Sequence, residues 1–431
     1  MQLPSIAFLY ELFEKHPSVQ TDTRKLQLGD LYFALKGPNF NGNTFAMAAL
    51  EAGASYAIVD EDIPYSKAID DRILQVDDVL TTLQALAKHH RQQFTIPFIA
   101  ITGSNGKTTT KELVSTVLAS HYKTYTTKGN LNNHIGVPLT ILSVGKDAEM
   151  AVIEMGANHQ LEIASYCTYT LPTHGMITNC GKAHLEGFGG EAGVRKGKGE
   201  LFDSIRNHQG TAFVMSDYDY LNEMSKGINE IITYGASSGD IQANAIDHHG
   251  MISIEGTKGF KERIDTQLVG TYNLPNVLAA VAIGLYFKVP MAKIKAAIEN
   301  YTPTNSRSQL MNWHHNQLIL DAYNANPSSM KLAIENFAKI DSAEKIMCLG
   351  GMKELGEESV LEHQALINYM QSFNWEQVVL VGGDFKFCQH QYLYFENALE
   401  AKQWLQQQNY SQKHILIKGS RGIQMEQLIA P

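Results

Sequence analysis

The sequence predicts an α/β protein built from parallel sheets with helices on both faces. Short apolar runs, typical of buried strands, alternate with longer segments of helical spacing along most of the 431 residues. One of these runs, residues 98–101, leads into a glycine-rich turn and then a helical pattern, the order of a phosphate-binding loop. A chain of this length is expected to form two or three domains, each with its own core.

The first expected domain, residues 1–78, reads as a small α/β unit. Apolar residues recur at helical spacing between residues 6 and 13, which predicts a helix near the start of the chain. Further on, we expect short strands at residues 30–35 and 57–59, with a helix at 45–52 between them.

Two longer regions follow, with boundaries expected at residues 79–304 and 305–431. In the first we expect strands at 98–101, 151–154, 175–178 and 212–214, and helices at 79–94, 110–120 and 277–286. The second repeats a strand–helix rhythm, with strands expected at 318–320, 345–347, 377–381 and 414–417. In both regions the alternation predicts a parallel sheet.

Composition excludes several classes of function. Hydrophobic residues make up 44% of the chain and charged residues 18%, as in soluble globular proteins. The net charge is −9 and no long basic run occurs, so we expect no nucleic-acid surface, although a local basic phosphate pocket is allowed. Four cysteines without a C-x-x-C pair indicate reduced thiols. With no basic leader and no apolar run of about 18 residues, we expect a cytoplasmic protein without a membrane span.

The phosphate-binding loop is the strongest functional signal. Residues 102–109 read Thr-Gly-Ser-Asn-Gly-Lys-Thr-Thr, and the backbone N–H groups of such a loop hold phosphate oxygens at a helix N-terminus. Lys107 is placed to reach the β- and γ-phosphates, and the Thr108 hydroxyl to bind Mg²⁺. Ile101 occupies the position of the first glycine of the full Walker A spacing. The alternative is an ordinary strand-to-helix turn.

Three further residues are candidate metal ligands or catalytic groups. Glu154 ends an apolar strand, where a carboxylate often anchors Mg²⁺ beside a nucleotide, and a surface or capping role is the alternative. His184 follows another strand and is either a ligand or a structural hydrogen-bonding group. Lys198 ends the basic run that starts at Arg195, and such runs more often form a solvated face.

Polar residues near the ends of later elements are candidate nucleotide contacts. Asn273 and Asn276 are able to read an adenine edge, because an amide offers both a donor and an acceptor. Capping of the helix after Pro275 is the alternative. Asp321 ends a strand, where ligands bind in parallel sheets, and a turn-forming cluster is the alternative.

The chain resembles the Mur ligase family over essentially its whole length. The phosphate loop marks the superfamily, and further matching strings are Thr21–Arg24, Gly29–Gly37, Gly129–Thr140, Ile153–Gly156, Ala183–Gly187 and Lys198–Glu200. Asp321–Pro327, Glu354–Gly356 and Lys418–Arg421 resemble in particular the members that add D-alanyl-D-alanine. The Asp-Asn-Pro-Arg string usual in diaminopimelate-adding members is not found.

This resemblance implies a function. The expected enzyme is an ATP-dependent, ADP-forming ligase of peptidoglycan precursor synthesis that joins D-alanyl-D-alanine to UDP-N-acetylmuramoyl-tripeptide through an acyl phosphate. It implies a UDP-substrate domain (1–78), a central P-loop ATPase-type domain (79–304) and a C-terminal Rossmann-like domain (305–431), with Mg²⁺ as cofactor and a monomeric state. The third residue of the tripeptide, meso-diaminopimelate or L-lysine, is not implied. We expect a hinge near residues 303–306, since Arg307 and Asp321 lie beyond it from the phosphate loop.

The resemblance also assigns residue roles. It implies catalytic roles for Lys107, Glu154, His184 and Lys198, with Thr108 and Glu154 holding one Mg²⁺ and with His184 and a carbamylated Lys198 holding a second. The residues that it places at ATP are Gly103, Ser104, Asn105, Gly106, Lys107, Thr108, Thr109, Asn273, Asn276, Arg307 and Asp321. Those that it places at the UDP substrate are Thr23, Arg24, Lys36, Asn130 and Asn133.

Some positions depart from the family pattern. Asn43 stands where many members have histidine, Ser216 replaces a common asparagine, and Gly351 replaces a common aspartate. These departures affect the expected UDP and amino-substrate contacts and leave the ATP and metal set intact.

Two rival functions are another amide ligase of the superfamily, such as a folylpolyglutamate or cyanophycin synthetase, and a nucleotide-binding module without turnover. The Lys418–Arg421 string argues against the first rival, and retention of the whole catalytic set argues against the second.

Overall fold

The computed structural model describes residues 3–63, 71–248, 250–303 and 307–430. Contacts between Cα atoms divide the chain into two compact units. The first comprises Met1–Ala100, Tyr122–Gly156 and Glu162–Gly175, and the second comprises Ile101–His121, Ala157–Leu161 and Met176–Pro431. The hinge expected near 303–306 falls on residues 304–306, which lie outside the described residues.

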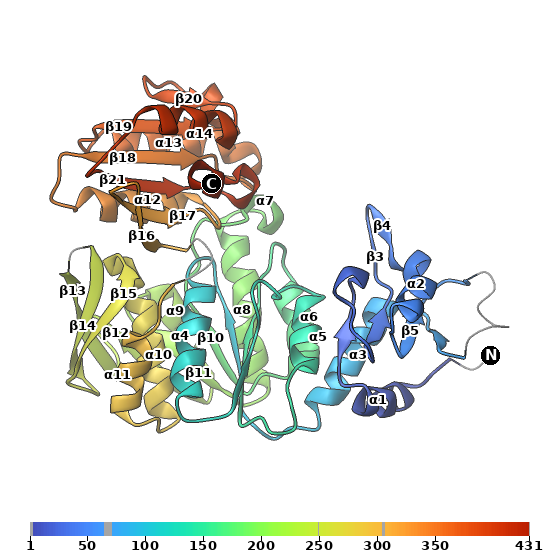
Figure 1. The fold of residues 1–431 in the computed structure, drawn as a ribbon. Helices are drawn as coiled ribbons and strands as arrows, with labels where there is room; N and C mark the ends of the chain where they lie inside the picture. The colour runs from blue at the N-terminus through green and yellow to red at the C-terminus, as the bar shows by residue number, and fades with distance from the viewer. Residues whose placement is uncertain (1–2, 64–70, 249, 304–306, 431) are drawn as a thin grey trace. The chain divides into compact units, whose positions relative to one another are not determined.

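A four-stranded parallel sheet forms the N-terminal part of the first unit, drawn in blue in Figure 1. Its strand order is β1 (Val19–Gln20), β2 (Leu31–Phe33), β5 (Tyr56–Val59) and β6 (Ile73–Gln75). The short strands β3 (Lys36–Gly37) and β4 (Phe40–Asn41) pair antiparallel outside this sheet. Helices α1 (Ile6–Lys15) and α2 (Ala46–Glu51) confirm the helical spacing seen in the sequence. Ser5 begins α1, because its side chain accepts a hydrogen bond from the Phe8 N–H at 3.2 Å.

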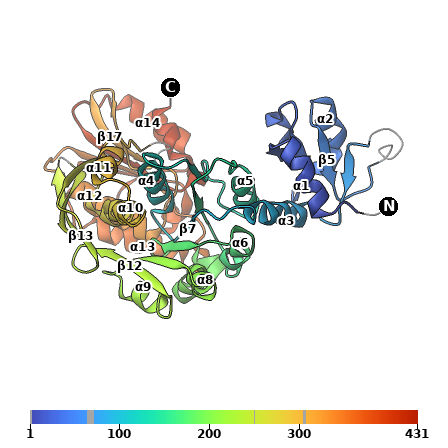
Figure 2. The ribbon, with the colours of Figure 1, turned by 90° about the horizontal axis from the view of Figure 1, so that it is seen from below.

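The region after residue 79 contains a nine-stranded sheet of order β15-β14-β13-β12-β11-β10-β7-β9-β8 among the described residues. Its strands are β7 (Phe98–Thr102), β8 (Thr124–Thr126), β9 (Met150–Glu154), β10 (His174–Ile177), β11 (Thr211–Met215), β12 (Glu230–Gly235), β13 (Ile241–His248), β14 (Met251–Lys258) and β15 (Arg263–Val269). Its helices are α3 (Val79–Arg91), α4 (Lys107–Ala119), α5 (Gly136–Leu142), α6 (Glu162–Thr170), α7 (Leu185–Phe188), α8 (Glu191–Asn207), α9 (Asp219–Met224), α10 (Leu274–Tyr286) and α11 (Met291–Glu299). Figures 1 and 2 both show α4 beside α10, the alanine-rich helix whose side chains are almost all buried.

The expectation of a wholly parallel sheet is wrong at one end of this region. Strands β13, β14 and β15 form an antiparallel run that the sequence reading did not include. Burial alternates along β15, where Ile264, Thr266 and Leu268 are buried and the residues between them are exposed. This alternation of period two is typical of an antiparallel strand with one solvated face. Such a strand contains no continuous apolar run, so the search for apolar runs in the sequence did not predict it.

A six-stranded sheet, drawn in orange to red in Figure 1, forms the C-terminal part of the second unit. Its strand order is β16 (Gln309–Trp313), β17 (Asn316–Asp321), β21 (His414–Lys418), β18 (Lys345–Gly350), β19 (Gln377–Val381) and β20 (Leu393–Phe395). The pairs β17–β21, β21–β18, β18–β19 and β19–β20 are parallel as expected, whereas edge strand β16 pairs antiparallel with β17 and was not expected. The helices are α12 (Pro327–Ala338), α13 (Ser359–Met370) and α14 (Ala398–Gln407).

The carboxyl ends of parallel strands position several of the polar residues near the candidate site. Glu154 ends β9, Asp321 ends β17 and Lys418 ends β21, and the phosphate loop follows β7. Ligands bind at this edge in open α/β sheets.

No helix among the described residues is long and apolar enough to cross a membrane.

Candidate functional site

Two glycines give the phosphate loop its shape. Gly103 has φ +144° and Gly106 has φ +79°, and both values favour glycine. A Cβ atom on Gly103 would lie 2.0 Å from the Thr178 hydroxyl oxygen, and one on Gly106 would lie 2.6 Å from the Asn276 amide oxygen. Gly106 is the N-cap of α4, so the helix starts at Lys107, three residues before the predicted Thr110. The loop therefore ends directly at a helix N-terminus, which favours bound anions.

The loop is held by residues that follow β10. The backbone N–H of Ser104 donates to the Asn179 carbonyl at 2.9 Å, and that of Asn105 donates to the Asn179 side-chain oxygen at 3.0 Å. The Thr178 hydroxyl donates to the Asn105 carbonyl at 2.6 Å. Thr178 and Asn179 were not predicted as site residues. Their polar side chains directly after a buried strand were the available signal.

Lys107 folds back over the loop that precedes it. Its ammonium donates to the carbonyl oxygens of Gly103 at 2.7 Å and Ser104 at 3.2 Å. Next to it, Thr108 is buried and Thr109 is half-buried in the first turn of α4. The ammonium thus lies at the loop and close to the helix N-terminus, where it adds positive charge to a site already suited to phosphate.

His184 contacts a carboxylate that the sequence reading did not select. Its Nδ1 atom forms an ion pair with Glu354, from the loop after β18. Hydrogen bonding to His184 holds the pKa of the Glu354 carboxyl below its usual range. Both residues have left-handed backbone, with φ +53° at His184 and φ +64° at Glu354. Glu354 belonged to a matching string, Glu354–Gly356, but no role was predicted for it.

Lys198 is buried, in contrast to its neighbour. Only 1% of Lys198 is exposed, whereas Lys196, on the same helix α8, is exposed. The Lys198 ammonium donates to the Ala157 carbonyl at 3.0 Å and lies 4.7 Å from the centre of the Phe188 ring. A carbonyl oxygen and an aromatic face both stabilise a cation, so these two contacts suit an ammonium. Lys198 is therefore not part of the solvated face that its basic run suggested.

In the first unit, Glu154 is buried to 1% exposure and is held by a neighbouring asparagine. The amide of Asn132 donates to the Glu154 carboxylate at 2.7 Å, and the Glu154 N–H donates to the Thr127 hydroxyl at 2.9 Å. A surface role for Glu154 is thereby ruled out. Asn132 was not predicted as a site residue, although its neighbours Asn130 and Asn133 were. Asn130 is exposed, and Asn133 accepts N–H hydrogen bonds from residues 135 and 136 at the start of α5.

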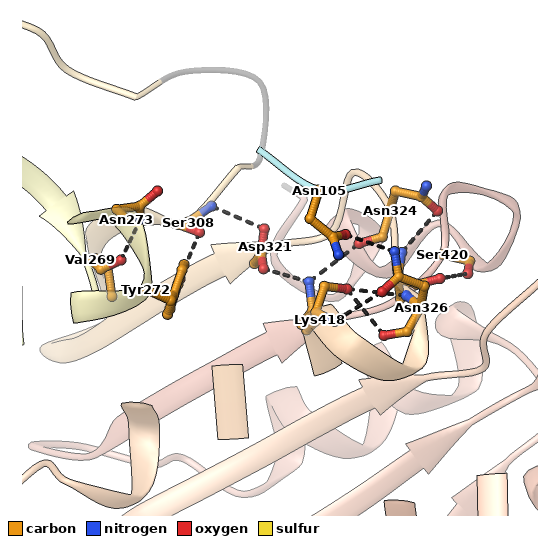
Figure 3. A network of polar contacts seen from close by, with 12 residues as sticks. Asn105, Val269, Tyr272, Asn273, Ser308, Asp321, Asn324, Asn326, Lys418 and Ser420 are labelled. Atoms are coloured by element: carbon orange, nitrogen blue, oxygen red, sulfur yellow. Dashed lines mark hydrogen bonds and ion pairs between the residues drawn. The ribbon is translucent and has the colours of Figure 1, made fainter. Parts of the chain in front are cut away.

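Asn273 and Asn276 hold each other in place. The Asn276 amide donates to the Asn273 side-chain oxygen at 2.7 Å, and the Asn273 amide donates to the Val269 carbonyl at 2.8 Å. The Asn276 oxygen accepts from the Thr110 hydroxyl of α4 at 3.0 Å. Figure 3 shows Asn273 with Val269. Asn273 is the N-cap residue of α10 but makes no side-chain capping bond, so the capping alternative is not supported. Through Thr110, the pair fixes α10 against the helix that starts at the phosphate loop.

Asp321 lies at the centre of a polar network shown in Figure 3. One carboxylate oxygen accepts the Lys418 ammonium at 2.5 Å, and the other accepts the Ser308 N–H at 3.1 Å. Lys418 is 2% exposed and stands opposite Asp321 in the register of β17 and β21. A residue of the neighbouring strand therefore holds the carboxylate in place. The alternative, that Asp321 only forms a turn, does not account for this contact. The guanidinium carbon of Arg307 lies 3.7 Å from the centre of the Tyr323 ring.

The same network joins the phosphate loop to helix α12. The Asn326 amide donates to the Asn105 side-chain oxygen at 2.7 Å (Figure 3). Asn326 is also the N-cap of α12, in a capping box with Ser329. Its side chain therefore both starts a helix and contacts the loop. Asn326 was part of a matching string without a predicted role.

The N-terminal candidates carry exposed positive charge. Arg24 makes a two-point contact with Asp22, both bonds at 2.8 Å, and this hydrogen bonding lowers the pKa of Asp22 to about 2. Thr23 is half-buried in the same short turn. Lys36 pairs with Asp60 at 3.1 Å. The side chains of Arg24 and Lys36 are 87% and 44% exposed, although each is paired with a carboxylate.

The departures from the family pattern have structural reasons. Asn43 is 3% exposed; its amide donates to the Asp60 carboxylate at 2.8 Å and its oxygen accepts the Asp60 N–H at 3.0 Å. Ser216 donates to the Ser238 carbonyl at 2.7 Å. A Cβ atom on Gly351 would lie 2.6 Å from the Cα of Gly383, so this close approach requires glycine. Asn43 thus supports the carboxylate that pairs with Lys36.

Family models match three parts of the chain. They are the Mur ligase family catalytic domain at residues 17–91, the Mur ligase middle domain at 101–284, and the Mur ligase glutamate ligase domain at 306–421. The UDP-N-acetylmuramoyl-tripeptide–D-alanyl-D-alanine ligase of Bacillus subtilis is 33% identical over 427 residues, which cover 95% of this chain and 92% of that protein.

Solved structures show the same similarity. The MurF crystal structure from Acinetobacter baumannii has a TM-score of 0.86 and 30% identity, and covers 95% of this chain and 92% of that one. The MurF ligase from Thermotoga maritima, in complex with ADP, has a TM-score of 0.85 at 24% identity, with coverage of 95% and 96%. The expected three-domain α/β fold is confirmed.

Proposed function

The chain belongs to the Mur ligase family, and we propose that it joins D-alanyl-D-alanine to UDP-N-acetylmuramoyl-tripeptide, using ATP and forming ADP and phosphate. The observation that carries this proposal is the phosphate loop. Gly103 and Gly106 adopt backbone angles suited to glycine, and Lys107 lies at the helix N-terminus that follows. This arrangement suits a nucleoside triphosphate.

In the proposed reaction, a terminal carboxylate oxygen of the tripeptide attacks the γ-phosphorus of ATP, and ADP leaves. The amine of D-alanyl-D-alanine then attacks the carbonyl carbon of the acyl phosphate. An amide bond forms, the carbon–oxygen bond to phosphate breaks, and the amine loses its protons. Lys107 is placed to offset the charge that builds on the transferring phosphoryl group, which is the main demand of this chemistry.

Two of the four proposed ligands supply the oxygen donors that suit Mg²⁺ as the cofactor. Mg²⁺ prefers oxygen donors; Thr108 and Glu154 supply them, and Asn132 already orients the Glu154 carboxylate. When bound, Mg²⁺ would neutralise phosphate charge. His184 offers its imidazole. Lys198 suits the set only after its neutral amine adds CO₂ to form a carbamate and a proton, which reverses the charge of the group.

The remaining residue roles are part of the proposal. We assign the nucleotide to the loop residues 103–109 with Asn273, Asn276, Arg307 and Asp321. Thr23, Arg24, Lys36, Asn130 and Asn133 are assigned to the UDP substrate. We also propose domain boundaries at 78/79 and 304/305 and a monomeric state. We propose a cytoplasmic location, because the reaction requires ATP and UDP-linked precursors as substrates.

The test is ADP release from the purified protein with ATP, Mg²⁺ and UDP-N-acetylmuramoyl-tripeptide, with and without D-alanyl-D-alanine. We expect turnover only when all are present. D-alanine, meso-diaminopimelate and L-glutamate serve as competing amine donors, and UDP-tripeptides that end in diaminopimelate or L-lysine identify the third residue. Faster turnover with a competing donor would instead indicate another amide ligase of the family.

A further inference from the structure

A pocket beside the phosphate loop has a lining that the proposed nucleotide site does not use. The loop after β10, the start of α8 and the helices α12 and α13 form it, all within the second unit. Its charged lining residues are Lys182, Lys331, Glu191 and Glu362. Two ammonium groups and two carboxylates sum to zero charge, so the pocket favours a neutral ligand over a polyanion such as a nucleotide.

Two of these four charges are already paired with each other. The Lys182 ammonium lies 2.6 Å from the Glu362 carboxylate, and only 11% of the Glu362 side chain is exposed. Glu191 is 3.7 Å from Lys182, and 55% of its side chain is exposed. The carboxylate of Glu191 is therefore held only loosely and remains open to a cationic group.

Lys331 supplies the opposite charge. It is exposed, its ammonium lies 4.6 Å from the centre of the Tyr369 ring, and it makes no ion pair with any carboxylate in the described part of the chain. Tyr369 donates its hydroxyl to Glu335 at 2.5 Å, and burial together with Glu335 raises the pKa of Tyr369 to about 12. Tyr369 is therefore neutral at physiological pH, and Lys331 remains open to an anionic group.

The same pocket touches the phosphate loop through Gly181. The Gly181 carbonyl accepts the Ser104 hydroxyl at 2.9 Å. A Cβ atom on Gly181 would lie 3.0 Å from the Ser328 hydroxyl and 3.3 Å from the Asn105 amide nitrogen. Because Gly181 lines the pocket and contacts the loop, a ligand here lies next to the site proposed for phosphoryl transfer.

We propose that this pocket binds the amino substrate as a zwitterionic dipeptide with small apolar side chains. Its carboxylate pairs with Lys331, its amino end faces Glu191, and its methyl groups lie on the apolar side chains of Ala365 and Leu366. This assignment rests on the proposed function, because it takes D-alanyl-D-alanine as the amine donor. It adds residues that determine the choice of donor.

The test pairs a protein variant with a ligand variant. The KM for D-alanyl-D-alanine and for its C-terminal amide is measured at saturating ATP and UDP-tripeptide, in the wild type and in Lys331→Ala. We expect Lys331→Ala to raise the KM for the dipeptide about tenfold or more, as for loss of a charge-assisted hydrogen bond. The amide lacks the carboxylate, so its KM should be high in the wild type and nearly unchanged by the substitution.

Two further variants complete the experiment. Lys339→Ala removes an exposed lysine at the end of the same helix, outside the pocket, and should leave every KM unchanged. Ala365→Trp fills the pocket from an exposed position and should raise the KM for the dipeptide but not the KM for ATP. An unchanged dipeptide KM in both Lys331→Ala and Ala365→Trp overturns the pocket assignment. A wild type that releases no ADP with D-alanyl-D-alanine overturns the proposed function instead.

Discussion

His184 and Glu354 form an ion pair that joins the loop after β10 to the loop after β18. The two residues are 170 positions apart, and neither loop alone shows why a left-handed backbone is needed at both. The pairing places a carboxylate on the imidazole that we assign to the metal site. Glu354 is therefore positioned to orient His184, as carboxylates orient metal-bound histidines elsewhere.

The stabilising effect of this pair should depend on pH. The pKa of Glu354 is lowered in the folded protein by its hydrogen bond to His184, so the carboxylate contributes stability above the unfolded-state pKa. This contribution is lost as the pH falls through the folded pKa. Thermal unfolding of the wild type and Glu354→Gln should differ by less than about 1 kcal/mol at pH 6, because Glu354 is half-exposed. The difference should begin to shrink below about pH 4.3, the ordinary glutamate pKa, and should vanish only below the lowered pKa of the folded protein. A difference that grows in acid would contradict this account.

Removal of the loop lysine should abolish most of the activity. Lys107→Ala deletes the positive charge at the phosphoryl group and should lower kcat by roughly 10²-fold or more. The exposed Lys226, which pairs only with Glu223 among the described residues, provides the control Lys226→Ala. ADP release and the melting temperature are measured for both variants. Near-normal turnover in Lys107→Ala would show that the site is misplaced.

Lys198 and Lys196 form a matched pair on helix α8. Lys198 is buried and Lys196 is exposed, so Lys198→Ala should nearly abolish activity and Lys196→Ala should change it little. If Lys198 acts as a carbamate, formate or acetate should partly restore activity to Lys198→Ala by occupying the vacated position. Mass spectrometry with ¹³CO₂ trapping reports the modification directly. An active Lys198→Ala variant together with unmodified Lys198 would refute the carbamate.

The glycines of the chain should differ in their tolerance of a methyl group. Gly103→Ala brings a Cβ to 2.0 Å from Thr178, whereas Gly129 also has positive φ but has no atom within 4 Å of the added Cβ. Gly129→Ala should cost about 1 kcal/mol from backbone conformation alone. Gly103→Ala should cost more than about 2 kcal/mol, because the loop must shift. Calorimetry of both variants measures the difference, and equal melting temperatures would show that the loop relaxes freely.

The sequence by itself determined the parallel α/β architecture and the phosphate loop. Both depend on local patterns: apolar runs predict buried strands, and glycines beside a lysine predict a phosphate-binding turn. The antiparallel strands β13 to β15 were missed because their pattern alternates with polar residues, and β16 was missed at the edge of its sheet. Local signals also misplaced the start of α4, since Gly106 caps the helix through its backbone rather than through a side chain.

Only the tertiary structure decided which polar residues support the site. Asn132 beside Glu154, Glu354 beside His184 and Asn326 beside Asn105 are each separated by 22 or more positions, so no local spacing reveals them. It also decided that Lys198 is buried and Lys196 is not. The physical reason is that hydrogen bonds and burial depend on distance in space, and packing of whole helices and sheets sets that distance.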